Sequence, residues 1–250
     1  MGKVARCTCI IGTYSDDFAT GTAFFVGPAT LLTAKHVAPE KSTRVVAQVP
    51  GARTGVIDDG ILVDENLSEE MIVCQVVPND LVSLVDITIL DCSQSKFRAT
   101  EWLELDRTIL KKAMEVDLIG YPGEYTLTYA RQTQGIDPKS EKSEYRNIED
   151  LLPRYELTIT HGTVIRGGSS PSYRVSTIAG MSGSPIVVNG KVVGIAQSYL
   201  TDRGVHTGCN KSGNNRGVAF SNDHAWKLLK DFGVRNIHVK SVADLKLELV

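Results

Sequence analysis

The 250-residue sequence has no apolar run that approaches the ~18–20 residues of a membrane-spanning helix. Its opening stretch, MGKVARCTCIIG, also lacks the apolar core of a secretory signal peptide. These absences predict a chain that neither crosses a membrane nor carries an export signal, and they favour a cytoplasmic location. A secreted protein whose signal peptide had been removed would show the same pattern.

Charge of one sign is not in excess either. The 27 Lys and Arg residues nearly balance the 29 Asp and Glu residues, which leaves a formal net charge of −2 and a pI near 6.2. The basic residues are scattered rather than clustered. Proteins that bind nucleic acid or anionic membranes carry a concentrated basic surface. Neither kind of partner is therefore expected.

Cysteines are few and odd in number: the chain has Cys7, Cys9, Cys74, Cys92 and Cys209. Cys7 and Cys9 would lie on one face of a strand, where they could not bridge comfortably. A disulfide framework is therefore not predicted, which favours a reducing compartment. The paired Cys and His spacings of zinc sites do not occur, so Cys7 and Cys9 are expected to be buried strand cysteines. No metal or other cofactor is expected.

Helical periodicity is scarce, and short strand-like segments dominate. Most segments alternate or run apolar briefly and stop at Gly, Pro, Asn or Asp, which indicates an all-β sandwich or barrel. The pair SPIVV and KVVGIA is joined by Asn189-Gly190, which favours a hairpin with a type I′ turn. The clearest helix spans 224–232, with a cap at 221–223 and an end at Gly233.

The chain divides into two β-rich halves, about 1–105 and 116–222, joined by the segment TILKKAM at 108–114. Residues 134–152 are charged and rich in turn formers, and they are expected to form an exposed loop. The tail at 236–250 could add a strand or contact another domain, and the sequence does not choose between these.

Ser182 stands in the stretch AGMSGSPIVVNG, framed by glycines and followed by a proline. By itself the stretch does not identify a nucleophile, because tight turns of small residues before a strand are much commoner than catalytic ones. A serine becomes a nucleophile only when a base takes its proton and a third group orients that base. Among five histidines, His36 is set apart because it ends an apolar strand, LLTAKHVA. Asp86 lies inside the apolar stretch VDITIL, where a carboxylate is costly unless it is paired.

The order GTAFFV, TAKHVA, VDITIL, GMSGSPIVV and VVGIA resembles trypsin-like (chymotrypsin-fold) serine proteases. The similarity is greatest to the disulfide-poor branch that includes glutamyl endopeptidases and high-temperature-requirement proteases, and it covers about 20–222. It implies an all-β fold of two packed six-stranded antiparallel Greek-key barrels with a C-terminal helix. The N-terminal barrel would span 1–110, the C-terminal barrel 111–222, and the helix and tail 223–250.

The resemblance also implies roles for individual residues. His36 would be the general base and later the general acid, Asp86 its orienting group, and Ser182 the nucleophile that forms an acyl-enzyme. The backbone N–H groups of Gly180 and Ser182 would form the oxyanion hole. Asp86 is preferred to Asp91 because the acid of this family precedes an alternating apolar strand. The expected activity is endopeptidase cleavage of a protein or peptide substrate.

Two residues depart from the pattern of the digestive relatives. Met181 stands where those relatives place an acid that pairs with a newly cleaved N-terminus, so activation by such cleavage is not expected. The oxyanion loop would be ordered either constitutively or by a regulatory partner protein. Lys35 precedes the histidine where a small residue is usual, and it is expected to face solvent. Alternative hypotheses are a catalytically silent or partner-activated scaffold that acts as a binding module, and a processing enzyme excised from a larger precursor.

Specificity is implied by the same resemblance. Ser176 stands where an aspartate would select Lys or Arg, and Ala196 stands where glutamyl endopeptidases carry a histidine. A neutral or apolar primary pocket is therefore expected. His161, on a central strand, is expected to bond to the backbone rather than to substrate. The residues assigned to substrate binding are Ser176, Thr177, Ala196, Gln197, Ser198, Tyr199 and Gly217.

Overall fold

The computed structural model describes residues 2–14, 18–40, 44–48, 50, 57–58, 61–62, 71–78, 85–122, 157–175, 177–178, 180–199, 209–210 and 215–234. The predicted loop at 134–152 and the tail at 236–250 lie outside the described residues. Within those ranges, no helix is both long and apolar enough to cross a membrane.

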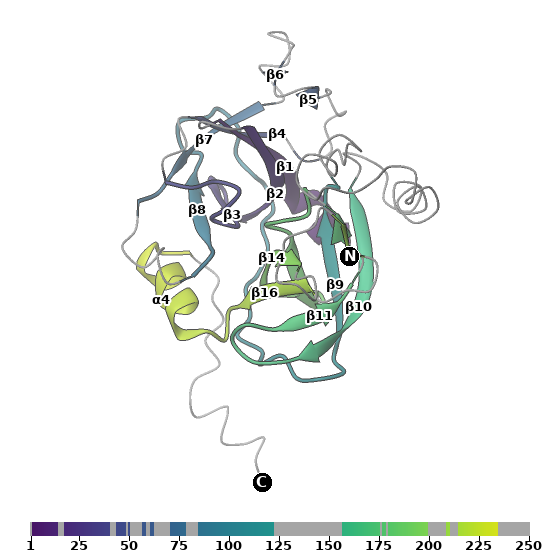
Figure 1. Ribbon diagram of the computed structural model, residues 1–250. Coiled ribbons are helices and arrows are strands. Elements are labelled where there is room, and N and C mark those ends of the chain that lie inside the picture. The colour runs from purple at the N-terminus through teal and green to yellow at the C-terminus, as the bar shows by residue number, and fades with distance from the viewer. Residues whose placement is uncertain are drawn as a thin grey trace, which may run out of the picture.

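The chain folds into two closed six-stranded barrels whose strands pair antiparallel (Figure 1). The strand order is β1-β2-β3-β8-β7-β4 in the N-terminal barrel and β10-β11-β16-β14-β13-β9 in the C-terminal barrel. The predicted all-β fold of two packed barrels with a C-terminal helix is therefore confirmed. The N-terminal barrel consists of β1 (Thr8–Tyr14), β2 (Phe18–Gly27), β3 (Thr30–Thr33), β4 (Arg44–Gln48), β7 (Met71–Val76) and β8 (Thr88–Asp91). The C-terminal barrel consists of β9 (Glu115–Gly120), β10 (Thr158–Arg166), β11 (Ser172–Arg174), β13 (Pro185–Val188), β14 (Lys191–Tyr199) and β16 (Asn215–Ala219).

Shorter elements complete the described chain. They are the strand pairs β5 (Ile57–Asp58) with β6 (Ile61–Leu62) and β12 (Thr177–Ile178) with β15 (Cys209–Asn210), and the helices α1 (Gly2–Cys7) and α4 (Asp223–Asp231). The boundary predicted at residue 110 falls in the segment between β8 and β9.

Each barrel encloses its own apolar side chains. Phe24, Leu32 and Leu90 are fully buried in the N-terminal barrel, and Leu118 and Ile186 are buried in the C-terminal barrel. Each large apolar side chain that is removed from water stabilises the fold by about 1.5–3 kcal/mol. The short apolar runs of the sequence are therefore the inward faces of barrel strands.

The local signals for the hairpin and the helix are confirmed. Asn189 and Gly190 have φ of 50° and 78°, as a type I′ turn between β13 and β14 requires. The side chain of Asn222 caps α4 by accepting hydrogen bonds from the first turn, and Gly233 follows the helix with φ of 60°. The apolar side of α4, including Trp226, joins a buried cluster made mostly of N-terminal-barrel side chains, with Val192 and other residues of the C-terminal barrel. The helix therefore connects the end of the second barrel to the first.

The segment 92–114 holds the two barrels together through its backbone. The N–H of Leu103 donates to the carbonyl of Phe25 in β2 at 2.9 Å. The N–H of Asp106 donates to the carbonyl of Val192 in β14 at 2.8 Å. Because hydrogen bonds to both barrels come from one short stretch, the segment restrains how the barrels sit against each other.

Cys7, Cys9, Cys74 and Cys92 are all buried and free of disulfides. Cys7 ends helix α1, so the prediction that it lies on a strand is wrong, whereas Cys9 lies on β1. Burial raises the pKa of the Cys7 thiol to about 11 and holds the pKa of the Cys9 thiol well above its usual value. The Cys92 thiol donates to Cys74 Sγ at 2.8 Å, and this bond together with burial raises the pKa of Cys92.

We therefore expect these four thiols to resist alkylation in the folded protein at pH 8, because all four are buried and the raised pKa values of Cys7, Cys9 and Cys92 suppress their thiolate forms. The measurement is iodoacetamide modification followed by peptide mass spectrometry, with the urea-unfolded chain as the positive control. Rapid modification of Cys7 or Cys9 in the folded protein would contradict the buried placement.

Candidate active site

His36 and Asp86 meet because β3 and β8 are neighbours. The antiparallel register pairs Thr33 with Thr88, so the residues just after β3 and just before β8 lie at the same end of the barrel. The imidazole Nδ1 of His36 lies 2.7 Å from Asp86 Oδ2, and the backbone N–H of His36 donates to Asp86 Oδ1 at 3.0 Å. Both carboxylate oxygens therefore hold the histidine, one through its ring and one through its backbone.

Asp91 has a different task. Its carboxylate accepts hydrogen bonds from the backbone N–H and the hydroxyl of Ser93 at 2.8 and 2.9 Å, which closes the turn after β8. Of the two acids weighed from the sequence, Asp86 is the one that contacts His36.

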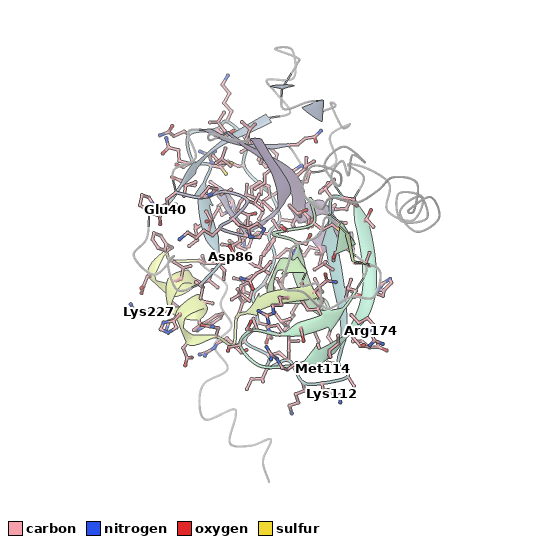
Figure 2. The ribbon with its side chains drawn as sticks, viewed as in Figure 1. Glu40, Asp86, Lys112, Met114, Arg174 and Lys227 are labelled. Atoms are coloured by element: carbon pink, nitrogen blue, oxygen red, sulfur yellow. The ribbon has the colours of Figure 1, made fainter. Side chains whose placement is uncertain are left out.

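Asp86 also contacts the other barrel. The side-chain amide of Gln197, on β14, donates to Asp86 Oδ2 at 3.2 Å (Figure 2 labels Asp86 between the barrels). Burial acts to raise the pKa of Asp86, but the hydrogen bonds from His36 and Gln197 outweigh it and hold that pKa below its ordinary value. Asp86 is therefore an anion at neutral pH, suited to stabilise a protonated imidazole.

The loop at 180–184 carries Ser182 and presses against the N-terminal barrel. Gly180 and Gly183 have φ of 93° and 89°, a region that favours glycine. A Cβ on Gly183 would stand 2.0 Å from the carbonyl oxygen of Thr22 and 2.4 Å from Thr33 Oγ1. Glycine is thus required at 183 both for its backbone angle and for the close approach of the two barrels.

The hydroxyl of Ser182 donates to the backbone carbonyl of Gln197 at 2.9 Å. Within the described residues it makes no hydrogen bond to His36, although the expected triad would contain one. Side chains of serine move between staggered rotamers, and exchanging one such hydrogen bond for another changes the free energy by only about 0.5–1.5 kcal/mol. The structure therefore joins the His36 imidazole to Asp86 and places the Ser182 hydroxyl on the Gln197 carbonyl.

Two N–H groups of the loop are left for a ligand. In the described part of the chain, the N–H groups of Gly180 and Ser182 donate to no acceptor. The next two are occupied, since Gly183 donates to the carbonyl of Ala196 at 2.8 Å and Ser184 to that of Met181 at 3.1 Å. Two N–H donors without an acceptor among the described residues, one on a candidate nucleophile and one two residues before it, are what an oxyanion needs.

The residues assigned to the substrate pocket fall in different surroundings. Thr177 is buried, and its hydroxyl donates to Asn215 Oδ1 at 2.7 Å. Ala196 is buried on β14 opposite Gly217 of β16, and a Cβ on Gly217 would stand 2.5 Å from Ile186 Cδ1.

Three more of these residues are described in part or not at all. Ser198 and Tyr199 lie on β14, with side chains outside the described residues, and Ser176 lies outside them altogether.

Lys35 is half-buried rather than fully exposed. Among the described residues, no group of three or more His, Cys, Asp or Glu could hold a metal ion.

The side chain of His161 differs from the sequence-based expectation. It pairs with Asp117 directly across β9 and β10 and is largely exposed, so the expected backbone partner is wrong. Gln197, which the sequence assigns to substrate binding, donates its side-chain amide to Asp86, a contact that the sequence did not predict. The one sequence feature that could have indicated this contact is the position of the Gln197 amide directly after the apolar run VVGIA.

The sequence model of one protein family, described as a trypsin-like peptidase domain, matches residues 21–195. The chain belongs to the trypsin-like peptidase family. The matched residues include His36, Asp86 and Ser182. The predicted family and enzyme class, a trypsin-like serine protease, are thereby confirmed.

Solved structures of proteases share the fold at low sequence identity. The Rv3671c protease from M. tuberculosis in its active form has a TM-score of 0.59 and 15% identity over 93% of this chain and 83% of its own. The HtrA-type protease AlgW with a tripeptide has a TM-score of 0.59 and 15% identity over 92% of this chain and 61% of its own. A serine endoprotease from Yersinia pestis has a TM-score of 0.56 and 15% identity over 92% and 64%. No curated protein matches this chain in sequence.

The lowered pKa of Asp86 predicts how its contribution to stability depends on pH. Above the ordinary value of 3.8 the stabilisation is fully present, and it is lost as the pH falls through the lower pKa of the folded state. We expect Asp86→Asn to lower the free energy of unfolding at pH 7 by about 1.5–3 kcal/mol, the value of hydrogen bonds to a charged group. The difference from wild type should vanish toward pH 2.

Urea unfolding at pH 7, 5, 4, 3 and 2 measures this difference. The matched control is Asp91→Asn, which removes a carboxylate from the same barrel without touching His36. A difference between wild type and Asp86→Asn that stayed constant down to pH 2 would contradict the assignment.

Proposed function

We propose that this serine protease is an endopeptidase that cleaves protein or peptide substrates through His36, Asp86 and Ser182, by way of an acyl-enzyme. The observation that carries the proposal is the His36–Asp86 pair held at 2.7 Å beside the loop of Ser182. That loop has two N–H groups without an acceptor in the described part of the chain. A base, an ionised acid, a hydroxyl and two free donors are the groups that acyl transfer requires.

Catalysis begins when the Ser182 hydroxyl turns from the Gln197 carbonyl to His36 Nε2. His36 takes the proton while Oγ attacks the scissile carbonyl carbon, and the carbonyl oxygen becomes an oxyanion that accepts hydrogen bonds from the N–H groups of Gly180 and Ser182. Asp86 stabilises the imidazolium. The C–N bond then breaks, and the amine leaves with the proton from His36.

Hydrolysis of the acyl-enzyme repeats these steps with water as the nucleophile. His36 takes a proton from the water as its oxygen attacks the ester carbon. The tetrahedral intermediate expels Ser182 Oγ, which regains its proton from His36, and the carboxylic acid product is released. No cofactor takes part in this scheme.

The primary pocket in this proposal is neutral or apolar. None of the residues assigned to it is charged; they are Ser176, Thr177, Ala196, Gln197, Ser198, Tyr199 and Gly217. A pocket without a buried charge leaves a Lys, Arg or Glu side chain of the substrate unpaired on desolvation, which is costly. Small or apolar side chains are therefore favoured.

A second candidate is a protease held inactive until a partner protein binds, with the fold serving meanwhile as a binding module. The hydrogen bond from Ser182 Oγ to Gln197 O favours it, because a hydroxyl held there is not activated by His36. In this alternative the partner, rather than the substrate, releases the hydroxyl.

Labelling with a fluorophosphonate distinguishes the two candidates. We expect wild type to be labelled, Ser182→Ala to take no label, and His36→Ala to react at least about 10³-fold more slowly, since loss of the base costs a serine protease most of its rate. The readout is in-gel fluorescence with intact-mass confirmation. If folded wild type without a partner protein takes no label, this result contradicts a constitutively active endopeptidase and supports partner activation.

Cleavage of a broad peptide library tests the pocket, with Ser182→Ala as the blank. We expect cleavage after small or apolar residues and a loss of at least about tenfold in kcat/KM after Lys, Arg or Glu, which corresponds to 1.4 kcal/mol. Mass spectrometry of the products gives the residue on the acyl side. A preference for basic or acidic residues would contradict the neutral pocket.

A further inference from the structure

Thr22 of β2 lies at the seam between the two barrels and is completely buried. Its hydroxyl donates to the carbonyl of Gly180 at 2.9 Å, and its backbone N–H donates to the carbonyl of Ser182 at 2.8 Å. The hydroxyl oxygen also accepts a hydrogen bond from the N–H of Tyr121 at 3.0 Å. One residue of the N-terminal barrel thus holds two carbonyls of the loop that carries the nucleophile.

These contacts restrain the peptide units on either side of the one that carries the N–H of Ser182, and the carbonyl of that unit, which belongs to Met181, accepts from the N–H of Ser184 at 3.1 Å. The peptide unit that contains this N–H joins Met181 to Ser182, between two units whose carbonyls Thr22 holds. Met181 is anchored as well, since its side chain is buried in the apolar cluster of the C-terminal barrel with Leu118 and Ile186. With both neighbouring units and the intervening side chain fixed, the Met181–Ser182 unit has little freedom to rotate.

The loop itself needs such a restraint. Gly180 adopts a positive φ, and glycine reaches other backbone angles at little cost, so the residue does not fix its own conformation. Met181 is uncharged and cannot hold the loop through an ion pair. Donors of an oxyanion hole act only when they are preorganised, so the restraint must come from contacts such as those of Thr22.

We propose that Thr22 is a positioning residue that orders the oxyanion loop through its hydroxyl, as an uncharged tie between the barrels. Thr22 Oγ1 accepts a hydrogen bond from the N–H of Tyr121, and its hydroxyl donates to the carbonyl oxygen of Gly180. A serine at 22 would keep this pair of bonds, whereas a valine would keep the shape and lose both. The inference rests on the proposed function only for its effect on rate, because the order of the loop is measurable without turnover.

The test compares Thr22→Val, Thr22→Ser and the matched control Thr8→Val. Thr8 is an equally buried threonine of the same barrel whose hydroxyl donates to a backbone carbonyl, that of Val4 at 2.8 Å, away from the loop. Backbone amide hydrogen exchange over 180–184 reports the order of the loop. The maximal rate and half-saturating concentration of fluorophosphonate labelling report catalysis.

We expect Thr22→Val to lower the maximal labelling rate by about 10²-fold, the lower end of the loss seen when an oxyanion donor is removed. The half-saturating concentration should change little, because initial binding does not use the hole. Exchange at the Gly183 and Ser184 amides, which donate to the carbonyls of Ala196 and Met181, should rise at least about tenfold above that in Thr8→Val, since a held loop becomes free to open. Thr22→Ser should restore both readouts to near wild type.

The proposal would be overturned if the loop amides of Thr22→Val exchanged no faster than those of Thr8→Val, whether or not the enzyme is active. It would also be overturned if the maximal labelling rate of Thr22→Val equalled that of Thr8→Val. If folded wild type takes no label while exchange still rises in Thr22→Val, the proposed catalytic function fails and the positioning role stands. Circular dichroism and thermal melting verify that each variant is folded.

Discussion

The chemistry of this protein depends on how closely the loop at 180–184 approaches the N-terminal barrel. At Gly183 any side chain would overlap the carbonyl oxygen of Thr22, so the two barrels touch through backbone. The strands of the barrels come from separate stretches of chain, 8–91 and 115–219. This contact therefore sets the position of Ser182 relative to the His36–Asp86 pair, and a small displacement at the seam would separate nucleophile from base.

Gln197 connects Asp86 to Ser182. Its amide stabilises the Asp86 anion, while its backbone carbonyl accepts the hydroxyl of Ser182. The acid and the nucleophile thus share one residue of β14, although they lie on different barrels. In the proposed mechanism, activation removes only the second of these bonds, so the acid stays oriented while the hydroxyl turns.

The loop at 180–184, in which we propose the oxyanion hole, is held by uncharged groups. The loop is restrained by the burial of Met181 and by the hydrogen bonds of Thr22 and Tyr121, rather than by an ion pair. A buried ion pair carries a large desolvation cost that its attraction must offset, and its strength changes when a partner titrates. Neutral hydrogen bonds and apolar contacts avoid both effects, so this loop keeps the same restraints across the pH range in which the barrels are folded.

Local patterns and one ordered set of motifs were enough to predict the two barrels, the Asn189-Gly190 hairpin, the helix ending before Gly233 and the family. The hairpin and the helix follow from the sequence because turn angles and caps depend on neighbouring residues, whereas the two barrels and the family follow from the resemblance of the ordered motifs to known proteases. The helical placement of Cys7, the Gln197–Asp86 bond and the resting orientation of Ser182 did not follow from it. The two hydrogen bonds join residues far apart in the chain, and long-range hydrogen bonds of this kind leave no repeating pattern in the sequence. Residue types therefore determined what chemistry is available, and the packing of one barrel on the other decided which groups meet.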